Sequence, residues 1–71
     1  MYRFLVVIEE SDKNFSAYSP DLPGCVATGK SRDDAETNMY EAIRFHLQGL
    51  LEDNQTIPRN SSYAEVMAIA A

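Results

Sequence analysis

The sequence predicts a small α+β fold in the order β-β-β-α-β, with one mixed four-stranded sheet covered on one face by a single helix. One long stretch has helical periodicity, four shorter stretches alternate or contain β-branched residues, and turn-forming residues separate them. The 71 residues, 45% hydrophobic and 24% charged, are expected to form one domain over residues 1–71. Such a chain buries only about 60% of its unfolded surface, so self-association would help to stabilise it.

The first two strands are expected at residues 2–9 and 15–18. In the first strand Leu5 and Val7 share one face, and both faces are apolar in the middle. We therefore expect this strand in the interior of the sheet, with its second face covered by something other than the helix, for which a second subunit is one candidate. A polar turn over residues 11–14 joins the two strands in a hairpin.

A loop follows the second strand, and the third strand is expected at residues 25–28. Pro23 fixes φ at one turn position and Gly24 permits a positive φ, so the loop is first of all structural. Asp21 could then accept a backbone hydrogen bond. Because loops on rigid scaffolds often carry recognition, a contact role is the second interpretation.

The helix is expected from Ser31 to about Asp53. Its apolar side, at 100° per residue, consists of Ala35, Met39, Ala42, Ile43, His46, Leu47 and Leu50. Ser31 is a good N-cap, and Pro58 cannot continue the helix. Tyr40 and Leu51 lie on the helix flank, where either the returning chain near Pro58 or another subunit would cover them.

The last strand is expected at residues 63–69, where larger and smaller side chains alternate, although Ala, Glu and Met also favour helix. A right-handed crossover would place it beside the first strand, in the spatial order 3-2-1-4. The open face of the sheet would then carry Leu5, Val7 and either Tyr18 or Phe15. An exposed apolar patch of this kind usually marks an association surface.

Charge and cysteine content argue against several functions. The formal net charge is −5 and the six basic residues are scattered singly, so direct nucleic-acid binding is not expected and a basic partner fits better. Cys25 is the single cysteine, which fits a reducing compartment and, with one histidine, cannot build a zinc site. The apolar opening is too short for a signal sequence or a membrane span, so we expect a cytoplasmic protein.

Two arrangements could support catalysis, but both have simpler interpretations. Cys25 and His46 could form a thiolate and imidazole pair, although a buried unreactive cysteine and a structural histidine are commoner. Glu9, Glu10 and Glu65 could hold metal ions for nuclease chemistry, but they are dispersed, and the middle of the first strand carries no carboxylate. We therefore rank an enzyme last.

Several short motifs follow one another along nearly the whole chain. They are Tyr18-Ser-Pro-Asp-Leu-Pro-Gly-Cys25, Gly29, Asp34-Ala-Glu36, Glu41-Ala-Ile43, Gly49-Leu-Leu-Glu-Asp53 and Ile57-Pro58. In this order and spacing they resemble the core motif of the HicB-like antitoxin family. The resemblance implies a β-β-β-α-β domain that is similar to a reduced ribonuclease H core and usually forms dimers or higher oligomers.

The resemblance also implies a partner. Family members typically neutralise a HicA-type toxin, a small basic ribonuclease that cleaves messenger RNA, and the acidic balance of this chain suits such a partner. Many members carry a C-terminal helix-turn-helix or ribbon-helix-helix segment that binds operator DNA. This chain reaches Ala71 without one, so we do not expect operator binding.

We therefore expect an antitoxin-like module that covers the RNA-binding and catalytic surface of its toxin and associates with itself as a dimer or tetramer. The alternative is an orphan homo-oligomeric scaffold or a small-ligand module without a toxin. The candidate partner contacts are Tyr18, Asp21 and Leu22 in the loop region, with Leu5 and Val7 on the open sheet face. No catalytic, metal-binding or cofactor-binding residue is expected.

Overall fold

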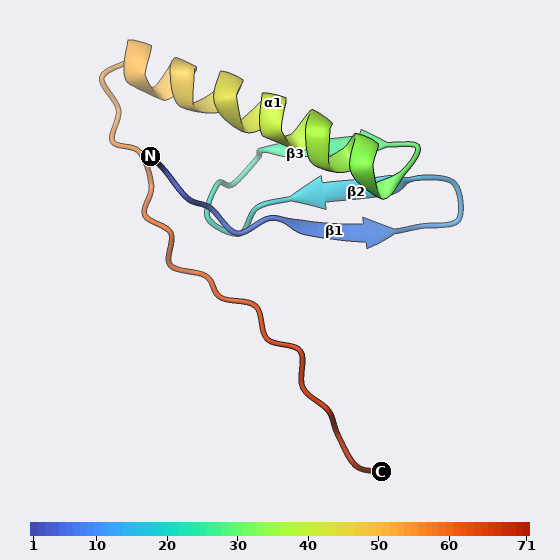
Figure 1. Cartoon of the computed structure of the whole chain (residues 1–71). Coiled ribbons are helices and arrows are strands. Elements are labelled where there is room, and N and C mark those ends of the chain that lie inside the picture. The colour runs from blue at the N-terminus through green and yellow to red at the C-terminus, as the bar shows by residue number, and fades with distance from the viewer.

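The computed structural model describes residues 1–71 and contains three strands and one helix. These are β1 (Val7–Glu10), β2 (Phe15–Tyr18), β3 (Val26–Gly29) and α1 (Arg32–Glu52). The sheet has the order β1-β2-β3, and both pairs of neighbours are antiparallel. The helix α1 covers one face of the sheet, and the chain after it passes the N-terminus and projects away as an extended segment (Figure 1).

The predicted fourth strand is wrong. Residues 63–71 form no strand, so the architecture is β-β-β-α in the order β1-β2-β3, instead of β-β-β-α-β in the order 3-2-1-4. A strand needs a neighbouring backbone for its hydrogen bonds, and side-chain alternation does not indicate where that neighbour lies. In the structure this segment meets no neighbour, because the chain runs away from β1 (Figure 1).

The first strand is shorter than predicted and lies at an edge of the sheet, not in its interior. Its ladder begins only at Val7, which pairs with Tyr18, the last residue of β2. Pro20 follows soon after and has no N–H for a ladder, so β2 offers no partner to Leu5. The Leu5 N–H instead donates a hydrogen bond to the Asp21 carboxylate at 3.0 Å.

The other elements follow the sequence prediction closely. The strand β2 has the predicted bounds, and β3 is displaced by one residue. The predicted N-cap is confirmed, because the Ser31 hydroxyl accepts a hydrogen bond from the Asp34 N–H at 3.1 Å. The helix ends before Asp53, its C-cap, and Asn54 follows with φ of 57°.

The core lies between the sheet and α1. Its fully buried hydrophobic members are Ala17, Leu22, Cys25, Ala35 and Met39. Partly buried hydrophobic residues pack against this core from both layers. The N-terminal segment and the sheet contribute Phe4, Val6, Ile8 and Ala27, and the helix contributes Ala42, Ile43 and Leu47. The predicted apolar stripe of the helix therefore does face the sheet. The helix does not combine the length and the apolarity needed to cross a membrane.

The sheet and the helix approach each other most closely at Gly29. A Cβ atom at this position would meet the backbone nitrogen of Ala35 and would lie 2.7 Å from the carbonyl carbon of Asp34. These backbone atoms can move aside only if the first turn of α1 moves with them, so glycine is required here. At Gly49, within the helix, an added Cβ would have no atom within 4 Å.

We expect Gly29→Ala to destabilise the protein by about 1–3 kcal/mol, because the added methyl group overlaps the start of α1. Gly49→Ala is the matched control and should stabilise the protein by about 1 kcal/mol, since alanine is the better helix former. Urea unfolding followed by circular dichroism measures both changes. Effects of the same sign would contradict the close approach at Gly29.

Candidate functional site

Internal hydrogen bonds of the β2–β3 loop fix the position of Asp21. The Ser19 hydroxyl accepts a hydrogen bond from the Asp21 N–H at 3.2 Å, and the Ser19 carbonyl accepts one from the Leu22 N–H at 3.2 Å. The Cys25 N–H donates to the Leu22 carbonyl at 3.1 Å, and Gly24, just before Cys25, has φ of 83°. Because few residues other than glycine adopt this angle, the predicted structural role of Gly24 is confirmed.

The Asp21 carboxylate joins three parts of the chain. Its Oδ2 atom accepts a hydrogen bond from the Leu5 N–H at 3.0 Å, and its Oδ1 atom accepts one from the Ser61 N–H at 3.1 Å. The residue is only 6% exposed. We call this arrangement of Asp21, Leu5 and Ser61 the Asp21 junction. The sequence suggested a backbone hydrogen bond for Asp21, but it gave no sign of partners 16 and 40 positions away.

The junction favours the ionised form of the carboxylate. The hydrogen bond from Leu5 lowers the pKa of Asp21 below its ordinary value, burial acts in the opposite direction, and hydrogen bonds from Ser61 and Ser62 lower the pKa further. A carboxylate with a lowered pKa stabilises the fold above its unfolded pKa. That contribution is lost as the pH falls through the folded pKa.

We expect Asp21→Asn to lower the melting temperature at neutral pH, because a side-chain amide has one acceptor oxygen for two backbone donors. The difference from the unsubstituted chain should shrink as the pH falls through the lowered pKa of Asp21, because Asp21 itself then becomes protonated. Melting curves at a series of pH values measure the difference. Asp12→Asn, in the exposed β1–β2 turn, is the control, and a pH-independent difference for Asp21→Asn would contradict an ionised junction.

The sheet face away from α1 carries an apolar row. Val7, Tyr18 and Val26 are paired neighbours across the three strands, so their side chains share one face. This face is the open one, because Ile8 and Ala17, which point the other way, pack in the core. Tyr18 is 40% exposed and Val26 is 66% exposed. We call Val7, Tyr18 and Val26 the apolar row.

The structure brings some of the predicted contact residues together and separates others. Tyr18 and Val7 lie side by side in the apolar row, and Leu5 is half-buried two residues before Val7. Leu22 is 0% exposed, and both Leu22 and Asp21 are enclosed beneath the loop, so in this conformation they present little surface to a partner. The contact role of all five residues stays a prediction.

Val26 was missed by sequence reasoning, which also left Tyr18 and Phe15 as alternatives for the open face. The register decides between these two, because Tyr18 pairs with Val7, whereas Phe15 lies on the same face as the buried Ala17. Val26 pairs with Tyr18 on the other side. The register of the β2–β3 hairpin is the signal that would have placed Val26, but a loop of this length does not determine it.

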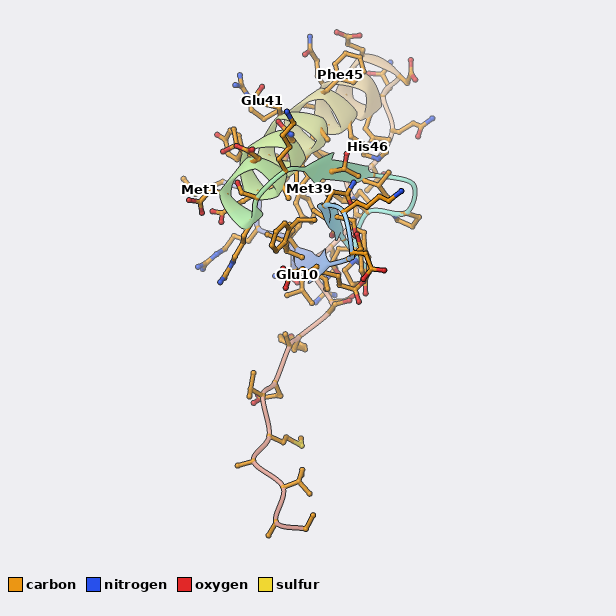
Figure 2. The ribbon with its side chains drawn as sticks, turned by 90° about the vertical axis from the view of Figure 1, so that its right-hand side faces the viewer. Met1, Glu10, Met39, Glu41, Phe45 and His46 are labelled. Carbon is orange, nitrogen blue, oxygen red and sulfur yellow. The ribbon has the colours of Figure 1, made fainter.

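Negative charge accompanies the apolar row. Glu9 lies on the same face, two residues after Val7, whereas Glu10 belongs to the other face. Glu10 is exposed at the end of β1 and lies apart from Phe45 on α1 (Figure 2). None of the three strands contains a lysine or an arginine. Apolar side chains flanked by charge of one sign favour a partner with the opposite charge.

The residues considered for catalysis do not form an activated site. Cys25 and His46 line the same shallow depression, but burial raises the pKa of the Cys25 thiol and so disfavours the reactive thiolate. Glu9, Glu10 and Glu65 belong to no group of three or more residues that could hold a metal ion. Packing therefore accounts for Cys25.

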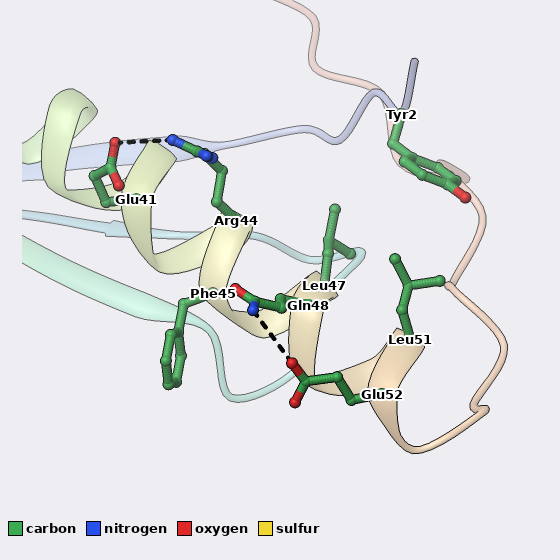
Figure 3. A pocket seen from close by; sticks show the side chains of 8 residues that line it. All are labelled: Tyr2, Glu41, Arg44, Phe45, Leu47, Gln48, Leu51 and Glu52. Carbon is green, nitrogen blue, oxygen red and sulfur yellow. Dashed lines mark hydrogen bonds and ion pairs between the residues drawn. The ribbon is translucent and has the colours of Figure 1, made fainter.

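The C-terminal half of α1 borders an open cleft of about 630 Å³ (Figure 3). Leu47 and Leu51 extend from the helix on the side where Tyr2 lies. Leu51 is 56% exposed and Tyr40 is 63% exposed, so the returning chain near Pro58 does not cover them. Contact with another subunit stays the open alternative for this flank.

Comparison with known proteins identifies the family. Residues 4–70 match the family model of the HicB-like antitoxin of bacterial toxin-antitoxin systems. The chain belongs to the HicB-like antitoxin family. This confirms the resemblance seen in the sequence motifs.

Relatives of this HicB-like chain occur in a phage and in cells. It is 36% identical over 56 residues to a 14.9 kDa protein of the rep-hol intergenic region of Haemophilus phage HP1, which covers 79% of this chain and 42% of the phage protein. It is 33% identical over 58 residues to a UPF0150 protein of Thermoplasma acidophilum, which covers 82% of this chain and 84% of the relative. The chain thus spans less than half the length of the phage relative.

A solved structure supports the same assignment. The HicB-like chain is similar to a chain of a HicA3 and HicB3 toxin-antitoxin complex, with a TM-score of 0.63 and 25% sequence identity. The match covers 86% of this chain and 72% of that one. The fold of this chain is therefore similar to that of a chain from a toxin-antitoxin complex.

Proposed function

We propose that this chain is an antitoxin that binds a HicA-like ribonuclease toxin and covers its RNA-binding and catalytic surface. The family match over residues 4–70 supports the antitoxin role. The likeness to a chain of the HicA3 and HicB3 complex supports a HicA-like partner. The partner would be a small basic protein that cleaves messenger RNA, so we place the action of this chain in the cytoplasm.

The apolar row is the surface that we propose for toxin contact. The observation that carries this proposal is the alignment of Val7, Tyr18 and Val26 in register across three strands that lack basic residues. Hot spots of protein interfaces are usually a few aromatic or apolar anchors within a charged rim. Glu9 beside the row and the net charge of −5 would attract and orient a basic toxin.

The apolar row suits a mechanism of occlusion, in which the antitoxin covers the RNA-binding and catalytic surface of the toxin. Carboxylates near the row would compete for the basic groups with which a ribonuclease binds phosphate, and the apolar contacts would hold the two proteins together. For Asp21 and Leu22 we propose a supporting role, in which they hold the loop next to Tyr18. Leu5 would take part at the margin of the row.

We also propose that the antitoxin associates with itself. A monomer leaves two apolar surfaces exposed to water. One is the helix flank with Tyr40 and Leu51, and the other is the C-terminal segment. These residues lie outside the apolar row. Toxin binding and self-association would therefore use different surfaces.

Co-expression with the small basic protein encoded beside this chain tests the function. The unsubstituted chain should restore growth and form a stable complex that is recovered by pulling on one partner. Val26→Lys should weaken the complex by about 10–100-fold, because it places a positive charge in the apolar row opposite a basic toxin. Thr37→Lys, at an exposed residue of α1, is the matched control and should bind normally.

Each outcome of this experiment is informative. If the protein encoded beside this chain is harmless, or if it is toxic and co-expression does not relieve its toxicity, this chain is not its antitoxin. Either result would favour an orphan oligomeric module. Equal affinities of Val26→Lys and Thr37→Lys would show that the toxin contacts another surface. Circular dichroism spectra confirm that both variants are folded before affinities are compared.

A further inference from the structure

The C-terminal tail, defined as residues 63–71, is an apolar segment held in water. Its four large hydrophobic side chains are between 73% and 100% exposed, and they are Tyr63, Val66, Met67 and Ile69. The tail contains one charged residue, Glu65, and neither proline nor glycine. Larger and smaller side chains alternate along the tail as they do in a strand, yet no backbone pairs with the tail in the structure (Figure 1).

The sheet lacks a neighbour at its β1 edge. The strand β1 pairs with β2 on one side only, and an edge strand with free N–H and C=O groups is a template for another strand. A groove of about 780 Å³, which we call the edge groove, runs between this edge and α1. Its apolar walls are formed by Tyr2, Phe4, Val6 and Ile8 on one side and by Met39, Tyr40, Ile43 and Leu47 on the other.

The Asp21 junction determines where the tail leaves the domain. The carboxylate that holds the Leu5 N–H also holds the Ser61 N–H, and beyond this point the chain runs away from the sheet (Figure 1). As a result the chain is 49 Å long and only 27 Å and 19 Å across in the other two dimensions. The tail therefore projects from the domain into solvent.

We propose that the tail of each chain adds as a strand to the free β1 edge of a second copy of this chain, where Tyr63, Met67 and Ile69 fill the edge groove. In a two-fold pair each copy supplies one tail and one edge, so neither is left unpaired. This inference gives a surface to the self-association proposed above, and it does not depend on toxin binding.

The dimensions of the tail and the groove agree. A strand of nine residues is about 30 Å long, which is enough to run beside the stretch from Tyr2 to Ile8 that forms one wall. Tyr63, Met67 and Ile69 occupy alternate positions and so share the face that would point into the groove. The smaller side chains between them would face away from the helix.

The charges of the edge groove and of the tail favour a second copy of this chain as the occupant of the groove. Three arginines and one acidic residue line the edge groove, namely Arg3, Arg32, Arg44 and Glu36. Arg44 makes an exposed ion pair with Glu41 at 3.8 Å, whereas Arg3 and Arg32 have no ion-pair partner in their own chain. Glu65 lies on the same face of the tail as Tyr63 and would therefore meet positive charge.

The first test is the oligomeric state of the purified chain, measured by size-exclusion chromatography with light scattering. The unsubstituted chain should be a dimer. A chain with both Met67→Asp and Ile69→Asp should have a dimer dissociation constant at least about 100-fold higher, because two charges would enter an apolar groove. Ala64→Asp with Ala68→Asp adds the same charges to the opposite face and should change this constant by less than about tenfold.

The second test distinguishes exchange between copies from closure within one chain. Tyr63 is replaced by a photoreactive benzoyl-phenylalanine, and the irradiated protein is run on a denaturing gel. A band of twice the mass, with the link at residues 2–8 of the other chain, is expected. Three results would each overturn the proposal. These are cross-links within one chain, a protein that is a monomer at all concentrations, and a dimer whose dissociation constant is unaffected by Met67→Asp with Ile69→Asp.

The photochemical test uses a folded chain, so it decides the question even if the aspartate variants fail to fold. Both tests are made without a toxin. A failure of tail exchange therefore leaves the antitoxin proposal standing, and normal toxin binding by Val26→Lys would leave tail exchange standing.

Discussion

The hydrogen bonds of one enclosed carboxylate position both ends of this small domain. Residues 2–6 belong to no strand, so the bond from the Leu5 N–H to Asp21 determines how the N-terminal segment lies against the loop. That position brings Phe4 and Val6 onto the core. The bond from Ser61 to the same carboxylate sets the path of the chain after α1. A neutral residue at position 21 would leave two backbone donors with weaker partners.

The parts of the fold that depend on local chemistry were predictable from the sequence. Ser31 caps the helix through a bond to a residue three positions away, and the helical period places Met39 against the sheet. The tail was not predictable in this way. Its alternation indicates a strand, but the neighbour of a strand is set by contacts that are distant in sequence, and the direction after Ser61 depends on a carboxylate 40 positions earlier.

The candidate site was predicted in part for the same reason. The two apolar faces of the first strand indicated Leu5 and Val7, and the register then joined Val7 to Tyr18. Leu22 looked like a contact residue because it lies in a loop, yet the loop folds over it and encloses it completely. Loop residues are exposed on average, but an apolar side chain in a short loop can also serve as its core. Burial of this kind has no periodic signal in a sequence.

The N-terminal half of α1 is more deeply buried against the sheet than its C-terminal half. Gly29 brings the sheet against the first turn, and the two fully buried helix residues, Ala35 and Met39, lie in the N-terminal half. Farther along, Phe45 and Leu51 are exposed, and their turns have water on several sides. Regions with few buried contacts open first in the native state. Fraying of this helix should therefore begin in its C-terminal turns, while the hydrogen bond from Ser61 to Asp21 still holds the start of the tail.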